Sequence, residues 1–110
     1  MNRDEIPPGT LYLLILKTLA LHGELHGYEI ADSIQQRSDE VLQVEEGSLY
    51  PALYRLELDG AIKAHWGVSE NNRKAKYYEI TKRGKKLLAT EQETWSRLSL
   101  GVQRVLARQL

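Results

Sequence analysis

Hydrophobic residues recur along this chain three or four positions apart, which is the spacing of amphipathic helices. The first such stretch is apolar on most of its sides, the next two have one apolar face each, and the last changes its spacing midway. Between the third and the fourth stretch, apolar and polar residues alternate, as they do in a β-hairpin. The pattern predicts helices over residues 11–22, 28–37, 47–59 and 82–109, and strands over 61–66 and 76–80.

The third predicted helix carries signals at both of its ends. Gly47 or Ser48 can cap its start, because a serine oxygen can accept a hydrogen bond from a free amide of the first turn. Pro51 is acceptable near that start, where its missing amide costs little. Gly60 suits the left-handed backbone conformation that commonly ends a helix.

The same helix divides into a buried face and an exposed face. Its inner face is expected to consist of Leu49, Leu53 and Leu56. Tyr50, Tyr54 and Arg55 then point outward, where two phenols and a guanidinium are offered to a partner. An ordinary surface helix is the alternative for these residues taken alone.

Two features around this helix indicate a winged helix-turn-helix. A short link over residues 38–44 separates it from the preceding helix, and a helix-turn-helix has this arrangement. The hairpin that follows at 61–80 would be the wing, with an exposed loop at 67–75. Arg73, Lys74 and Lys76 lie at or beside its tip and could contact a phosphate backbone or a minor groove. A solvated run of charge is the alternative.

The last predicted helix has the spacing of a dimerisation helix. Thr81 can cap its start, and Trp95, Leu98, Val102 and Val105 follow in steps of three, four and three, as in a coiled-coil seam. At about 1.5 Å per residue the helix would be roughly 40 Å long, more than the preceding residues can cover. We therefore expect a DNA-binding domain over 1–80 and a dimerisation helix over 81–110, with packing inside one chain as the alternative.

The first predicted helix is also expected to take part in the dimer. It is apolar on most sides, and a small domain rarely buries such a helix completely. The expected dimer interface consists of Leu11, Leu14, Trp95, Leu98, Val102 and Val105.

Composition indicates one small domain in a reducing compartment. The chain has 110 residues, a net charge of zero and no cysteine, so disulfides and thiolate metal sites are excluded. Its start does not resemble a signal peptide, and the apolar run at 11–21 is too short to span a bilayer and contains Lys17. We expect a cytoplasmic protein without membrane contact. Acids dominate residues 24–60 and bases dominate 73–86, so a local basic segment can still meet DNA.

Catalysis and metal binding have little support in the sequence. His22 and His26 lie four positions apart with Glu24 and Glu29 nearby, but Gly23 falls between them and should end the helix. The two rings therefore need not converge on one ion. No phosphate-binding loop, nucleophile motif or pair of acids in a cleft is evident, so we expect no enzyme activity, catalytic residue, metal or cofactor.

Several linked motifs occur together in a recognisable order. Over nearly its full length the chain resembles PadR-type bacterial transcriptional regulators, and its single terminal helix is similar to their short subfamily. The residues that carry the resemblance are His26-Gly27-Tyr28-Glu29-Ile30, Gly47-Ser48-Leu49-Tyr50-Pro51, Leu53, Arg55-Leu56-Glu57, Gly60, Ile62, Lys76-Tyr77-Tyr78, Ile80-Thr81 and Gly84.

The resemblance implies a mostly helical winged-helix protein that forms a homodimer and represses a nearby promoter. It assigns DNA contacts to Ser48 and Tyr50, and we expect Tyr54, Arg55 and the basic wing residues to add to them. The wing lacks the glycine that is usual in the family, and Leu58 stands where relatives commonly have a charge. A winged helix used only for protein contacts is the alternative.

Trp95 is the candidate effector site. Multidrug-sensing members of the short subfamily hold flat aromatic compounds between paired tryptophans at the dimer centre, and Trp95-Ser96-Arg97 is similar to that setting. The resemblance thus implies a planar aromatic effector, with Trp95 as a dimer anchor alone as the alternative.

Overall fold

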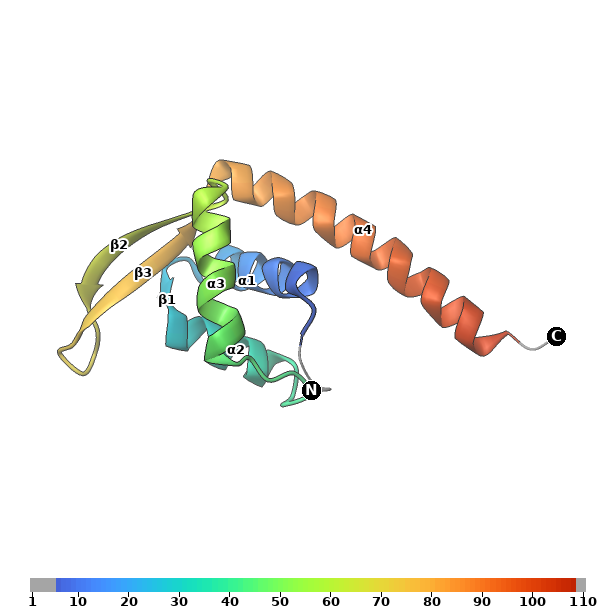
Figure 1. Ribbon diagram of the computed structural model, residues 1–110, viewed down its shortest axis with the longest axis horizontal. Coiled ribbons are helices and arrows are strands. Elements are labelled where there is room, and N and C mark those ends of the chain that lie inside the picture. Colours follow the sequence, from blue (N-terminus) through green and yellow to red (C-terminus); the bar gives the residue numbers. More distant parts are fainter. Residues whose placement is uncertain (1–5, 109–110) are drawn as a thin grey trace.

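The computed structural model of the chain describes residues 6–108, so the outermost parts of both predicted domains lie outside the described residues. Within these described residues, the fold consists of four helices and a small antiparallel sheet (Figure 1). The mostly helical class and the long C-terminal helix are confirmed. The elements are α1 (Pro8–His22), β1 (Leu25–His26), α2 (Gly27–Arg37), α3 (Glu46–Leu58), β2 (Ile62–Val68), β3 (Lys74–Ile80) and α4 (Lys82–Ala107).

The core lies where α1, α2 and α3 meet the base of the sheet. α1 gives it four large side chains, α2 gives Ile30 and Ile34, and Leu88 of α4 lies at its margin. Burying these apolar side chains is the main force that holds the helices together. The inner face predicted for α3 is confirmed, because Leu49, Leu53 and Leu56 are all buried.

α1 begins earlier than its predicted start at residue 11. The helix starts at Pro8, and the Leu11 amide donates to the Pro7 carbonyl at 2.9 Å. Proline at the first helical position has a suitable φ and loses no hydrogen bond there. Gly23 ends the helix with a φ of 83°, in agreement with the sequence.

The sheet has a third strand that the sequence pattern did not predict. Leu25 and His26 form β1, which pairs with Tyr78 and Tyr77 of β3, so that the strand order is β1-β3-β2. Two residues are too few to show an alternating pattern, which explains why this strand was missed.

The hairpin is longer than predicted and its loop is shorter. β2 and β3 continue to Val68 and Lys74, so the predicted loop at 67–75 shrinks to residues 69–73. Asn72 adopts a φ of 58°, a conformation that asparagine tolerates better than most residues. A turn without glycine can therefore still close the hairpin.

The start of α3 differs from its prediction, whereas its end does not. The helix begins at Glu46 with no side-chain cap, so neither Gly47 nor Ser48 caps it. Pro51 consequently lies in the second turn, and the Gly47 carbonyl lacks the helical hydrogen bond that the Pro51 amide would have donated. Gly60 has a φ of 79°, as expected of a glycine that ends a helix.

A tight junction joins the end of α3 to the start of α4. The Thr81 hydroxyl accepts a hydrogen bond from the Gly84 amide at 3.0 Å and donates to the Gly60 carbonyl at 2.6 Å, which confirms Thr81 as the cap. A Cβ on Gly84 would lie 2.0 Å from the Ala61 carbonyl oxygen. Only glycine therefore allows α4 to approach this closely.

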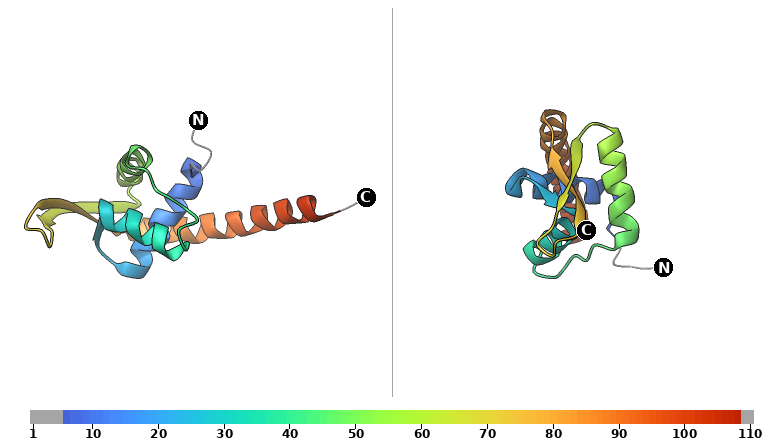
Figure 2. Two further views of the ribbon diagram at one scale, coloured as in Figure 1. Left: turned by 90° about the horizontal axis from the view of Figure 1, so that it is seen from below. Right: turned by 90° about the vertical axis from the view of Figure 1, so that its left-hand side faces the viewer.

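Beyond Leu88, α4 leaves the domain and projects away from it (Figure 1 and Figure 2, left). Its only buried residues are Gly84 and Leu88, both near its start. Within residues 6–108, no helix combines the length and the apolar character that crossing a membrane requires.

We predict that Gly84→Ala destabilises the protein by at least about 2 kcal/mol, because overpacking against backbone cannot relax as a flexible side chain can. The matched control is Gly9→Ala, where an added Cβ has no described atom within 4 Å. Urea unfolding of both variants measures the difference. Equal stability of the two variants would contradict the packing at this junction.

Candidate nucleic-acid interface

α3 lies at the surface with one side along its whole length facing away from the domain (Figures 1 and 2). Tyr54 and Leu58 are 64% and 67% exposed, and Tyr50 is 48% exposed. The outward positions predicted for Tyr50, Tyr54 and Arg55 agree with their exposure. An isolated exposed helix of this kind can enter a groove about as wide as the major groove of DNA.

One flank of α3 faces the hairpin across a shallow groove of about 390 Å³. Tyr50 lies against the start of α2, where a Cβ on Gly27 would be 2.9 Å from its hydroxyl, so glycine makes room for the ring. On the opposite wall, the Lys74 Nζ lies 5.5 Å from the centre of the Trp66 ring. The residues lining this groove are His26, Gly27, Tyr28, Tyr50, Trp66, Lys74, Ala75, Lys76 and Tyr78.

Lys76 lies in this groove but is engaged with α3. Its Nζ is 3.1 Å from the Glu57 carboxylate, and it also lies 5.7 Å from the centre of the Tyr78 ring. The hydrogen bond that Lys76 donates to the Glu57 carboxylate raises the pKa of Lys76, although burial opposes the shift. Burial raises the pKa of Tyr78, and the nearby Lys76 charge opposes this. Lys76 thus ties β3 to α3 and is less available to a phosphate than Lys74.

Two bases near the hairpin tip have no such partner. Within residues 6–108, Arg73 and Lys74 make no ion pair, and both are exposed. Two exposed cations at the end of a projecting hairpin suit contact with a phosphate backbone.

The other flank of α3 faces the start of α1. Ser48 and Arg55 line a second shallow groove, of about 330 Å³, together with Tyr12 and Pro51. The structure therefore does not gather all the sequence-predicted DNA contacts at one point. Ser48 and Arg55 lie on one side of α3, whereas Tyr50 and the wing residues lie on the other.

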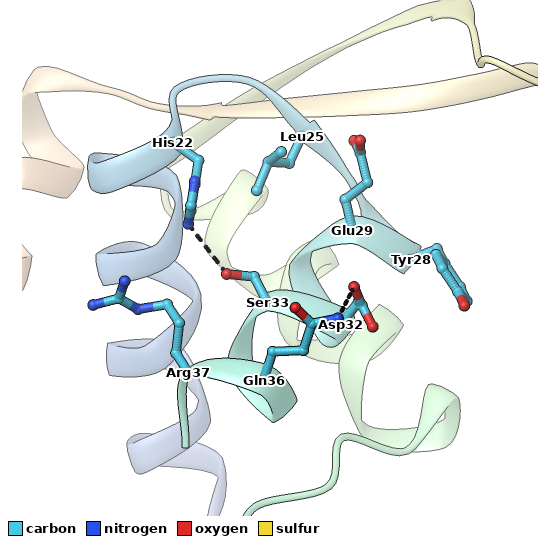
Figure 3. A pocket seen from close by; sticks show the side chains of 8 residues that line it. All are labelled: His22, Leu25, Tyr28, Glu29, Asp32, Ser33, Gln36 and Arg37. Carbon is cyan, nitrogen blue, oxygen red and sulfur yellow. Dashed lines mark hydrogen bonds between the residues drawn. The ribbon is translucent and has the colours of Figure 1, made fainter. Parts of the chain in front are cut away.

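The histidines serve local structure. His26 caps α2, because its Nδ1 accepts from the Glu29 amide at 3.4 Å while the Glu29 carboxylate accepts from the His26 amide at 3.0 Å. His22 lies in a separate pocket between α1 and α2, where its Nε2 is 3.2 Å from the Ser33 hydroxyl (Figure 3). In the described part of the chain, no three histidine, cysteine or acidic side chains are placed to hold a metal ion.

The residues predicted for the dimer interface divide into two groups. Leu11 is only 2% exposed and belongs to the core of the single chain, so it has almost no surface left for a partner. Leu14 is partly buried. Trp95, Leu98, Val102 and Val105 are all exposed on α4, with Trp95 at 46% and Leu98 at 63%. Leu98, Gly101, Val102 and Val105, with Arg97 and Leu106, also line an apolar hollow of about 440 Å³.

Sequence reasoning did not assign Trp66, Tyr28 or Glu57 to the interface. Trp66 was considered only as part of an alternating strand, although an exposed tryptophan after a candidate recognition helix is a signal in itself. The Lys76–Glu57 pair spans 19 positions, and no sequence spacing predicts such a contact.

Comparison with known proteins places these features in a family. The model of the Transcriptional regulator PadR-like family matches residues 15–90. An uncharacterised protein of Lysinibacillus sphaericus is 36% identical over 96 residues, which cover 87% of each chain. This chain and the Lysinibacillus sphaericus protein therefore match over most of their lengths.

Two solved structures illustrate the likeness. A transcriptional regulator from Clostridium thermocellum is 34% identical with a TM-score of 0.78, and the match covers 91% of this chain and 95% of that one. A PadR family transcription regulator from Clostridium difficile is 29% identical with a TM-score of 0.74, covering 88% of this chain and 98% of that one.

Proposed function

The chain belongs to the PadR-like family of transcriptional regulators, whose members are not enzymes, and we propose that it is a homodimeric repressor that binds a two-fold symmetric operator. The observation that carries the proposal is the exposed α3 beside a hairpin whose tip bears unpaired cations. One subunit would occupy each half-site, and the half-sites would lie about one helical turn apart, roughly 34 Å.

Each group around α3 has a separate role in this proposal. Ser48 and Arg55 would contact one wall of the major groove, and Tyr50 would contact the other. Tyr54 faces the groove between them. Arg73 and Lys74 would bind the flanking backbone, while Lys76 holds the wing against α3 through Glu57. Charged side chains supply the affinity here, because neutralising phosphates releases condensed counterions.

Lys74→Ala is expected to weaken binding to all duplexes alike and to flatten the salt dependence. If a dimer neutralises about six phosphates, the log-log slope of affinity against salt should be near −5, and losing one contact per subunit should reduce it by about two. A gel shift on the DNA upstream of its own gene, repeated across salt concentrations, measures both.

The matched control for that measurement is Lys17→Ala, which removes an exposed lysine from α1. Its slope should equal that of the unaltered protein. A slope near zero for the unaltered protein would contradict phosphate contact altogether.

Tyr50→Ala should weaken operator binding while leaving the dimer intact.

Dimerisation is proposed to occur through the apolar side of α4. Trp95, Leu98, Val102 and Val105 would otherwise expose a continuous apolar surface on a helix that projects into solvent. Their spacing suits a two-helix seam, in which each side chain packs between residues of the partner. Leu11 is left out of this interface because the core already buries it.

Leu98→Glu should convert the dimer to a monomer at micromolar concentration, since a carboxylate in an apolar seam loses its hydration without gaining a partner. Gln103→Glu is the control, because it adds the same charge roughly 140° around α4. Sedimentation equilibrium distinguishes the two variants. A Leu98→Glu protein that remained dimeric would contradict the seam.

Trp95 is proposed to bind a planar aromatic effector where the two α4 helices meet. An indole exposed on one subunit and faced by its copy could stack on both sides of a flat ligand. Planar aromatic cations should therefore quench Trp95 fluorescence in a Trp66→Phe background, and the Leu98→Glu monomer should lose the effect. No quenching across a varied panel, with the dimer intact, would refute the effector role.

A further inference from the structure

The side chains of α3 restrict which bases it can recognise. Between Glu46 and Leu58 the helix has no asparagine, glutamine, lysine or histidine. It therefore lacks the amide groups that form paired hydrogen bonds with adenine, and Arg55 is its single partner for guanine. Glu46 could accept from a cytosine amine, whereas Glu57 is engaged with Lys76. The remaining polar side chains of the helix are hydroxyls. Hydrogen bonds from α3 can thus specify only a few positions.

An apolar strip occupies the outward side of the same helix. Pro51, Tyr54 and Leu58 follow in steps of three and four, so they form one row along α3. All three are exposed, and Tyr54 and Leu58 are about two-thirds exposed. We call Pro51, Tyr54 and Leu58 the apolar strip. Leu58 contributes nothing to the core, so its apolar character needs another explanation.

The polar groups lie to either side of the apolar strip. Ser48 and Arg55 border it toward α1, and Tyr50 borders it toward the hairpin and Lys74. When a helix lies in a major groove, its flanks face the two phosphate walls and its outermost row faces the base edges. The flanking cations thus suit the backbone, and the apolar strip suits the groove floor. The thymine methyl is the apolar group exposed on that floor.

We propose that the apolar strip recognises thymine methyl groups, so that the operator half-site is specified largely by thymines in contact with Tyr54 and Leu58. This rests on the proposed function, and it adds the base chemistry that α3 recognises. DNA is the partner that fits the apolar strip, because the strip adjoins the polar flanks of α3 and has cations beside it.

Uracil substitution tests the proposal, because deoxyuridine lacks only the methyl group and keeps the hydrogen-bonding edge of thymine. The bound site is first recovered by selecting duplexes with the full-length chain from a random pool. Each thymine of that site is then replaced in turn by deoxyuridine. At least one replacement per half-site should weaken binding about fourfold, the effect of exposing one methyl-sized group.

The residue assignment is tested with Leu58→Ala. This variant should bind the thymine site about fourfold more weakly and should no longer distinguish thymine from uracil at the position that Leu58 contacts. Leu21→Ala is the matched control. Leu21 is exposed near the C-terminal end of α1, and this end of the helix lies away from α3 (Figure 2, left). It should retain the full thymine preference. Thermal melting verifies that both variants are folded.

The outcomes separate this inference from the function on which it rests. Tight, salt-dependent binding with no uracil effect at any position would overturn the thymine proposal and leave the repressor proposal standing. A uracil effect of equal size in Leu58→Ala and the unaltered chain would also overturn it, because the methyls would be recognised elsewhere. Failure to recover any duplex, together with no salt-dependent binding, would overturn both and favour a protein partner for α3.

Discussion

The junction of Thr81, Gly84 and the Gly60-Ala61 turn determines how the two working parts of the molecule are related. α3 ends at one side of this turn and α4 starts at the other. The Thr81 hydroxyl closes the turn at 2.6 Å from the Gly60 carbonyl, and the missing side chain at Gly84 lets α4 contact the Ala61 backbone. Because both contacts involve backbone, they fix the direction in which α4 leaves the domain relative to α3. A junction of this kind is where an effector bound between two α4 helices would have to act on α3.

α3 separates its functions by side. One side is buried in the core, two flanks carry polar groups, and the outermost row is apolar. Lys76 illustrates why exposure alone does not define a contact, because its charge is already engaged by Glu57. The side chains of Lys76 and Glu57 each remain about one-third exposed, so water screens the ion pair and its contribution to stability is modest. Its main effect is to fix the hairpin relative to α3. Acidic and basic residues balance over the whole chain, and a chain with no net charge can still present cations at the hairpin tip.

The sequence predicted what depends on local pattern and missed what depends on distant contacts. Helical periodicity located all four helices, and the side-chain cap at Thr81 and the glycine at 60 were recognised from residue type alone. β1 was missed because two residues carry no periodicity, and the start of α3 was misplaced because its first turn has no side-chain cap. The burial of Leu11 could not be predicted, since both partner and core positions favour leucine. For the candidate site, outward positions followed from geometry, but the pairing of Lys76 with Glu57 and of Tyr50 with Gly27 required the fold.

The central claim is that two copies, joined through α4, place two α3 helices on one face of a DNA duplex. Hydroxyl-radical footprinting of the full-length protein on its selected operator tests this most directly, because the cleavage pattern reports which backbone positions are covered. We expect two symmetric protected blocks on the same face of the duplex, centred about 10 base pairs apart. A single protected block, or uniform protection without symmetry, would contradict the paired arrangement.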